Sequence, residues 1–349
     1  MCIRKRYCLI KRDEDHAKLD IKKLDHLTGS HTGGHHYGGN MRKNIFRQHH
    51  INILVYAGVF LVVFVLSAVI RIRLLGSAPN RLLNVEWNEQ TGTVYRDLSY
   101  GNHAYDMYIP NGLNPEEDQY LILFIHGGSF NSGSKEDGDA WCKFYASKGY
   151  ITATVDYTLQ NHGETATINL MNEEIESAVS AIKDKSESLG FHIVTMASCG
   201  VSAGGTLAMN LAYNGRSSIP VRFVFQLAAP TWFEPADWHL LKKVDKLKTD
   251  EQFVSMMTND GDWKAISPAW IVQTNSVPTL MGYGLIDHCV PLNQKKILMD
   301  AMDEVQADYK YIPFPNSNHG MYNDLDKMQE FIDLSLHYCE VYLPESHNE

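Results

Sequence analysis

From about residue 92 to residue 349 the chain alternates short apolar or β-branched runs with longer amphipathic segments. Such alternation is typical of the α/β class, in which helices cover both faces of a mostly parallel sheet. Apolar positions at helical spacing predict one helix over residues 166–190, ending at Gly190, and a second over 206–214. We predict about eight strands, the first two antiparallel, at residues 93–98, 104–109, 120–126, 150–157, 191–200, 221–229, 277–284 and 309–315.

An apolar run from Ile51 to Ile70 precedes this region and contains no charged residue. At a rise of about 1.5 Å per residue, a helix of these 20 residues extends about 30 Å, the thickness of the hydrocarbon core of a bilayer. We therefore predict one transmembrane helix over residues 51–70. The alternatives are a buried core helix, which is rarely this long without a polar face, and a cleaved signal peptide, whose apolar region usually spans only about 7–15 residues.

Charge differs in sign on the two sides of this run. Residues 1–50 hold 11 Lys and Arg against 5 Asp and Glu, whereas residues 71–349 hold 20 against 36. An acidic main body argues against nucleic acid as a partner. We expect a basic tail (1–50), a linker (71–91) and a domain (92–349). Because the positive side of a membrane protein faces the cytosol, we predict a single-pass protein whose domain is extracytoplasmic.

The tail contains a His- and Gly-rich run at residues 31–40, a composition that occurs in metal-binding segments. Its spacing is not that of a structural zinc site and no cysteine lies nearby, so a polar linker explains it more simply. We predict no metal and no organic cofactor.

Residues 200–205 read G-V-S-A-G-G, directly after a predicted strand and directly before a predicted helix. A serine at a sharp turn between a strand and a helix has its hydroxyl raised above the sheet, and the flanking glycines allow the chain to pass closely. Ser202 is therefore the candidate nucleophile.

A second motif, H-G-G-S-F, follows the predicted strand at residues 120–126. Consecutive glycines let backbone N–H groups turn toward the oxygen that becomes negative during acyl transfer. We expect the N–H groups of Gly127, Gly128 and Ala203 to form an oxyanion hole. An ordinary glycine turn is the alternative.

A serine hydroxyl needs a histidine base and a carboxylate that orients the base. Asp287 and His319 follow two predicted strands in turn, and the order Ser, Asp, His is that of an α/β-hydrolase. His162 and His288 are rival bases, but neither follows a strand in that order.

Asp287 lies in G-L-I-D-H-C-V-P and His319 in N-S-N-H-G. Together with G-V-S-A-G-G and H-G-G-S-F, these motifs resemble those of α/β-hydrolase esterases that carry an H-G-G motif, near the hormone-sensitive-lipase-like and feruloyl-esterase-like carboxylesterases. The resemblance covers residues 92–349. It implies that Ser202 is the nucleophile, Asp287 orients the base, His319 is the base, and Gly127, Gly128 and Ala203 bind the oxyanion. His126 resembles a residue that shapes the loop and takes no proton.

The resemblance also implies a small cap at about residues 230–277, where Trp232, Phe233, Trp238, Trp263 and Trp270 are found. These aromatics are candidates for lining an acyl or aryl pocket, and packing of the cap on the sheet is the alternative.

One departure from the family pattern and two cysteines near the motifs remain. After the strand that ends Val155-Asp156-Tyr157, the chain reads T-L-Q-N-H-G-E where many relatives have an Arg-Leu-Ala-Pro run. We expect Asp156 to be structural. Cys199 and Cys289 are expected to be small buried hydrophobes rather than reactive thiols.

The sequence thus predicts a membrane-anchored serine hydrolase that cleaves small-molecule carboxylic esters through an acyl-enzyme. A peptidase or amidase with the same triad is one alternative, because the fold does not separate ester from amide cleavage. A catalytically inactive binding domain on the same scaffold is the other. The oligomeric state is not predicted.

Overall fold

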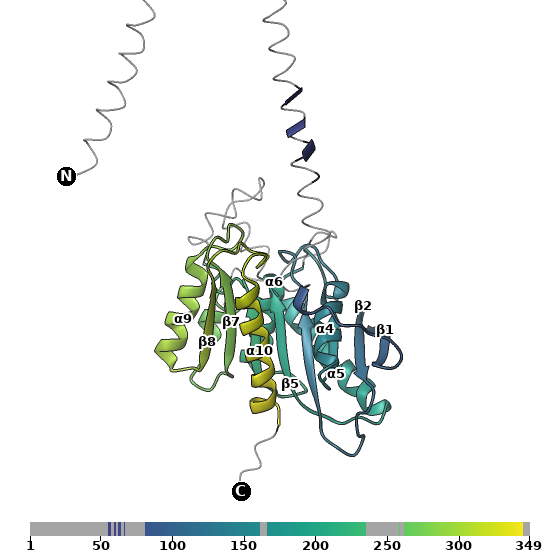
Figure 1. The fold of residues 1–349 in the computed structure, drawn as a ribbon. Helices are drawn as coiled ribbons and strands as arrows, with labels where there is room; N and C mark the ends of the chain where they lie inside the picture. Colours follow the sequence, from purple (N-terminus) through teal and green to yellow (C-terminus); the bar gives the residue numbers. More distant parts are fainter. Residues whose placement is uncertain are drawn as a thin grey trace, which may run out of the picture. The chain divides into compact units, whose positions relative to one another are not determined.

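The computed structural model describes residues 81–160, 166–234, 258 and 262–344, together with seven residues between positions 55 and 66. The chain divides into a unit at Met1–Val69 and a unit at Ile70–Glu349, and the second carries all the elements labelled in Figure 1.

The predicted transmembrane segment, residues 51–70, lies mostly outside the described residues. Its seven described residues are helical, and each side chain is more than half exposed. Within the described part of the chain, no helix has both the length and the apolar character needed to cross a bilayer. The transmembrane helix stays a prediction.

One eight-stranded sheet organises the second unit, in the order β1-β2-β4-β3-β5-β6-β7-β8. β2 pairs antiparallel with both β1 and β4, and every other pairing is parallel. The mostly parallel sheet with two antiparallel strands at its start is therefore confirmed. The strands are β1 (Gly92–Tyr100), β2 (His103–Pro110), β3 (Gln119–Ile125), β4 (Ile151–Val155), β5 (Ile193–Val201), β6 (Val221–Leu227), β7 (Thr279–Gly284) and β8 (Tyr309–Phe314).

Helices cover both faces of this sheet. Successive side chains of a strand point to opposite faces, and all five residues of β4 are buried, so neither face is open there. The described helices are α4 (Asp139–Ala146), α5 (Ile168–Ser188), α6 (Ala203–Asn214), α8 (Pro268–Ile271), α9 (Asn293–Val305) and α10 (Leu325–Tyr342), with a 3-10 turn η1 (Lys135–Gly138) before α4 (Figure 1).

Local signals explain where the long helix α5 begins and ends. The Thr167 hydroxyl accepts the N–H of Leu170 at 3.1 Å, which satisfies one of the free donors of the first turn. Two residues after the last helical residue, Gly190 has φ +85°, a conformation that glycine adopts without strain. The helix predicted over residues 166–190 is thus observed with the expected stop.

Aromatic side chains join two helices to the middle of the sheet. Phe225 on β6 packs against Tyr145 of α4 and Phe331 of α10, with ring centroids 5.5 and 6.3 Å apart. The buried Tyr145 hydroxyl also forms a 2.6 Å hydrogen bond with Ser335 of α10. Because α4 and α10 are held together over one face, the loops at the ends of the intervening strands have a rigid base.

Residues 81–91, which the sequence analysis assigns to the linker, pack on the domain. Leu83 is only 1% exposed, and Trp87 lies edge-on to Tyr108 of β2 with ring centroids 6.2 Å apart. The packed domain therefore includes residues from position 81 onward.

Candidate active site

Ser202 occupies a strained turn between β5 and α6. Its φ of 55° and ψ of −125° are unusual for a residue with a side chain. The turn is held because the Ser202 N–H donates to the carbonyl of Leu227 at 2.8 Å. A methyl group on Gly204 would lie 2.0 Å from the carbonyl oxygen of Ile125, and one on Gly200 would lie 2.4 Å from the Gly204 backbone. Both glycines are therefore required for the strand and the helix to approach each other.

The loop after β3 approaches this turn closely. A methyl group on Gly127 would lie 2.6 Å from the carbonyl oxygen of Val201, next to Ser202. Gly128 has φ +113°, and a methyl group there would lie 2.0 Å from the carbonyl oxygen of Ser132. Among the described residues no oxygen accepts the N–H groups of Gly127 or Gly128. Ala203 is the first residue of α6, so its N–H has no acceptor within the helix.

His126 fixes the start of this loop and is 1% exposed. Its ring stacks on Tyr157 with centroids 4.2 Å apart, and its Nδ1 lies 2.7 Å from the carbonyl oxygen of Gly127. Burial lowers the pKa of His126 below its ordinary 6.5, although the Gly127 carbonyl and nearby carboxylates oppose the shift. A neutral ring that donates from Nδ1 to the loop agrees with the shaping role that the sequence implies.

Ion pairs around the buried Lys135 and Asp106 hold the outer part of the same loop against the first strands. The Nζ of Lys135 lies 2.8–2.9 Å from carboxylates of Asp97, Asp106 and Glu136, and the side chain is only 4% exposed. Burial alone favours the neutral amine, but the carboxylates raise the pKa of Lys135 above its ordinary value. Asp156, expected to be structural, accepts the Lys135 backbone N–H at 2.8 Å.

Asp287 and His319 lie in the loops that follow β7 and β8. His319 Nδ1 lies 2.8 Å from Asp287 Oδ2. The other carboxylate oxygen, Oδ1, accepts the N–H groups of Cys289 at 2.7 Å and Val290 at 3.1 Å. Asp287 is 4% exposed, so its oxygens are hydrogen-bonded by these three donors rather than by water. The two residues that the sequence predicted as acid and base are thus in direct contact.

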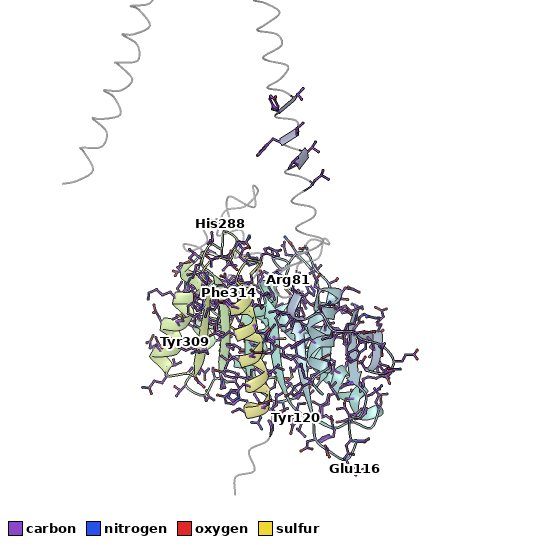
Figure 2. The ribbon with its side chains drawn as sticks, in the orientation of Figure 1. Arg81, Glu116, Tyr120, His288, Tyr309 and Phe314 are labelled. Atoms are coloured by element: carbon purple, nitrogen blue, oxygen red, sulfur yellow. The ribbon has the colours of Figure 1, made fainter. Side chains whose placement is uncertain are left out.

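The loops that follow the strands lie at one end of the sheet. Figure 2 shows His288, which follows Asp287, at the opposite end of the domain from Glu116 and Tyr120 near the start of β3. This is the expected position, because parallel strands bring their carboxyl ends to one edge.

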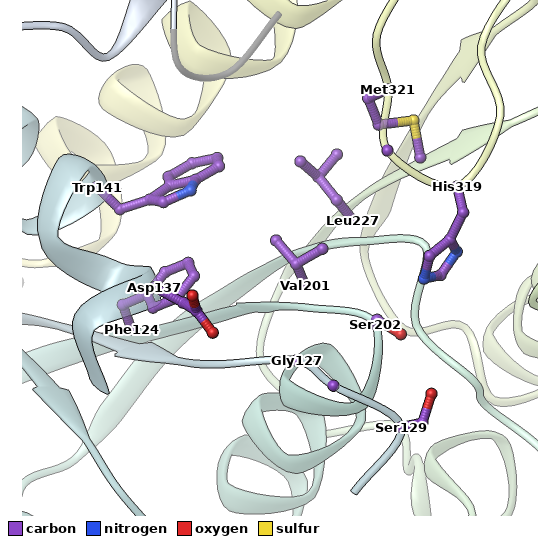
Figure 3. A pocket seen from close by; sticks show the side chains of 12 residues that line it. Phe124, Gly127, Ser129, Asp137, Trp141, Val201, Ser202, Leu227, His319 and Met321 are labelled. Carbon is purple, nitrogen blue, oxygen red and sulfur yellow. The ribbon is translucent and has the colours of Figure 1, made fainter. Parts of the chain in front are cut away.

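Ser202 and His319 line the same cavity, which has a volume of about 390 Å³ (Figure 3). No hydrogen bond joins the Ser202 hydroxyl to His319, although both residues are described. Contacts of this kind are often long before substrate binds. The rival base His288 is exposed and does not line the cavity, and His162 lies outside the described residues.

The other side of the cavity is formed by residues that the sequence analysis did not single out. Trp141 of α4 and Asp137 of η1 lie there, across from His319 (Figure 3). Trp141 belongs to an amphipathic helix and Asp137 to a polar segment, and neither lies in a sequence motif that indicates a functional site. The apolar lining residues are Phe124, Trp141, Val201, Leu227 and Met321.

The aromatics of the predicted cap do not line this cavity where they are described. Trp232, Trp263 and Trp270 pack on one another with centroids 4.6–6.1 Å apart, and Phe233 is fully buried against Phe130. None of these four lines the cavity, and Trp270 is 51% exposed. Trp238 and most of the cap segment lie outside the described residues.

The two cysteines near the site differ in exposure. Cys199 is 1% exposed, as expected. Cys289 is exposed, so the expectation that it is a buried hydrophobe was wrong. The reason is the turn around the Asp287 carboxylate, which directs residue 289 outward. Partial burial and the Asp287 charge raise the pKa of the Cys289 thiol.

A serine at a turn between strand and helix, with a carboxylate and imidazole pair after two later strands of a mostly parallel sheet, defines the α/β-hydrolase class. The BD-FAE family model matches residues 105–302, more than half of the chain. The chain belongs to the BD-FAE family, and the resemblance to α/β-hydrolase carboxylesterases is confirmed. The matched region includes Ser202 and Asp287, and His319 lies beyond it.

Two characterised relatives match shorter parts of the chain. Esterase LipI of Mycobacterium tuberculosis (strain ATCC 25618 / H37Rv) is 28% identical over 134 residues, which cover 38% of this chain and 40% of the relative. Kynurenine formamidase of Danio rerio is 29% identical over 116 residues, which cover 32% of this chain and 36% of the relative. The chain therefore matches well under half the length of either relative.

Solved structures extend the likeness to the whole fold. The propionate-bound esterase Est2 of Thermogutta terrifontis superposes with a TM-score of 0.59 at 18% identity, covering 73% of this chain and 97% of that one. A truncated carbohydrate esterase from gut microbiota gives the same TM-score and identity, covering 72% and 98%.

Proposed function

We propose that the protein is a serine hydrolase that cleaves small carboxylic esters through an acyl-enzyme, with Ser202, Asp287 and His319 as its triad. The observation that carries this proposal is the 2.8 Å hydrogen bond between His319 and the buried Asp287, at a cavity into which Ser202 also opens. A carboxylate that accepts Nδ1–H leaves the Nε2 lone pair of the ring free to take a proton.

The first half of the reaction forms the acyl-enzyme. Ser202 Oγ attacks the ester carbonyl carbon while His319 Nε2 accepts the serine proton. The imidazolium that forms is stabilised by Asp287, which keeps its own charge. When the intermediate collapses, His319 returns the proton to the departing alcohol. In the second half, water repeats these steps on the acyl-enzyme and releases the acid.

In this proposal, the oxyanion of each tetrahedral intermediate accepts hydrogen bonds from the backbone N–H groups of Gly127, Gly128 and Ala203. The first two donate to no described acceptor, so they are available without breaking an existing hydrogen bond. Loss of one such donor typically costs about 3 kcal/mol of barrier.

Labelling with a fluorophosphonate probe tests the nucleophile. We expect the full chain to be labelled and the Ser202→Ala variant to remain unlabelled while keeping the same thermal unfolding midpoint. Absence of labelling in folded wild-type protein would instead support an inactive binding domain.

Amide cleavage is the second candidate, and the similarity to a kynurenine formamidase favours including it. Rates with a short p-nitrophenyl ester and with an aminoacyl p-nitroanilide discriminate the two. Ester cleavage predicts a large excess of the first rate, and the reverse order would assign the protein as an amidase or peptidase.

We also propose that residues 51–70 anchor the protein in a membrane with the catalytic domain extracytoplasmic. The uncharged run and the basic segment before it support this proposal. Protease added to intact cells should digest the domain of a carboxy-terminally tagged full chain. Recovery of the full chain in the soluble fraction would contradict the anchor.

A further inference from the structure

We propose that Asp287, Cys289 and His319 form an inhibitory binding site for a thiophilic divalent cation such as Zn²⁺, which would switch the hydrolase off reversibly. The proposal rests on the proposed function for its effect on catalysis, but not for the binding itself.

The three side chains offer a carboxylate oxygen, a thiol sulfur and an imidazole nitrogen that lie within 4.8 Å of one another. Oxygen, sulfur and nitrogen donors together are a ligand set typical of Zn²⁺, which binds them at about 2.0–2.3 Å in tetrahedral geometry. Ligands on such a site are separated by roughly 3.3–3.7 Å, given those bond lengths. Only a small movement is therefore needed to bring the three ligand atoms to the spacing of a tetrahedral site.

The loop structure shows which side chain can make that movement. Asp287 is fixed by two backbone N–H groups and by His319. Cys289, in contrast, is exposed and forms no described side-chain hydrogen bond, so its sulfur can rotate toward the other two ligands. A tetrahedral cation would keep one position for water.

Binding would block His319, the base on which the proposed catalysis depends. The cation replaces the thiol proton of Cys289, which is released to water, and takes a lone pair from the His319 ring. If it binds Nε2, the lone pair that accepts the serine proton is used directly. If it binds Nδ1, the ring proton moves to Nε2 and occupies the same lone pair. Either way His319 no longer acts as a base.

Cations that prefer only oxygen are expected to leave the enzyme active. Mg²⁺ and Ca²⁺ bind carboxylates, carbonyls and water, and this site offers a single carboxylate that is already hydrogen-bonded. Selectivity for Zn²⁺ or Cd²⁺ over Mg²⁺ therefore follows from the thiol.

The first test measures binding without activity. Cd²⁺ is titrated into the reduced full chain while the ultraviolet cadmium–thiolate absorption band is recorded. We expect a band that saturates with one tightly bound cation and is lost in Cys289→Ser. Cys142, Cys199 and Cys339 are buried, so the matched control is Cys2→Ser/Cys8→Ser, which should keep the band. A band of full strength in Cys289→Ser would overturn the proposal.

The second test measures ester hydrolysis against Zn²⁺ concentration, each variant relative to its own rate with chelator. Wild type should be inhibited and should recover when EDTA is added, whereas Mg²⁺ should have no effect. Cys289→Ser should need at least about tenfold more Zn²⁺ for half inhibition, as expected for losing a donor. If hydrolysis continues at cation concentrations that saturate the absorption band, the inhibitory role is refuted. If no ester is cleaved at all, the proposed function fails and the binding result still stands.

Discussion

Replacing Asp287 by asparagine removes one charge while keeping the size of the side chain, and it separates the two jobs of this carboxylate. Oδ1 accepts the N–H groups of Cys289 and Val290, and Oδ2 accepts Nδ1–H of His319. Asparagine has only one acceptor oxygen, so it can accept either from the two backbone N–H groups or from His319, but not from both.

The loop decides which side is satisfied. With its oxygen toward His319, the asparagine NH₂ would face two N–H donors and two hydrogen bonds would be lost, at about 1 kcal/mol each. The oxygen is therefore expected to stay at the Oδ1 position, with the NH₂ facing Nδ1 of His319. The ring must then carry its proton on Nε2 and cannot take the proton of Ser202. We expect kcat to fall about 10,000-fold, as the same change does in a serine protease triad.

Initial rates of p-nitrophenyl acetate hydrolysis at saturating substrate measure this loss, and thermal unfolding verifies that the variant is folded. Asp300→Asn on α9 makes the same chemical change at an exposed residue that pairs with Lys296, and we expect it to keep the wild-type rate. A folded Asp287→Asn protein with kcat within tenfold of wild type would refute the assigned pair.

Three further predictions concern the loop and the cavity. Gly128→Ala should lower kcat by about 100-fold, because the new methyl group meets the Ser132 carbonyl and displaces an oxyanion donor. The control is Gly149→Ala, which should keep the wild-type kcat because Gly149 has a similar φ but no atom near the position of the new methyl group. Asp137→Asn removes a carboxylate that would attract a cationic substrate. It should therefore reduce the preference in kcat/KM for a trimethylammonium ester over its neutral tert-butyl isostere about fivefold, which corresponds to about 1 kcal/mol of screened attraction. An unchanged ratio at low salt would contradict this. Because His126 has a lowered pKa when folded, the unfolded state binds the extra proton, so the free energy of unfolding should fall as pH drops below about 6.5. Urea unfolding at pH 7.5 and 5.5 should show a smaller fall for His126→Gln, and an equal fall would count against a neutral buried ring.

The sheet was predictable because each strand is marked by a short apolar run between polar segments. β3 and β4 bury nearly every residue, so their runs are continuous, and the turn residues between strands fix the boundaries within a few positions. The contact between Asp287 and His319 could be anticipated for a related reason. Both follow parallel strands, and β7 and β8 are neighbours in the sheet.

What the sequence could not provide is the direction of individual side chains. Trp141 and Tyr145 both belong to the apolar face of α4, yet Trp141 lines the cavity and Tyr145 packs against α10. Periodicity identifies the buried face of a helix, but not whether a residue on that face meets a cavity or another side chain. The exposure of Cys289 depends on hydrogen bonds to one carboxylate oxygen, and composition gives no signal for them.

The glycines around Ser202 carry an evolutionary consequence. Gly200 and Gly204 are demanded by backbone contacts that persist whether or not the hydroxyl reacts. A descendant that lost the Ser202 hydroxyl would still need both glycines to fold. Gly200 and Gly204 therefore indicate ancestry and architecture, whereas enzymatic activity must be judged from Ser202, Asp287 and His319.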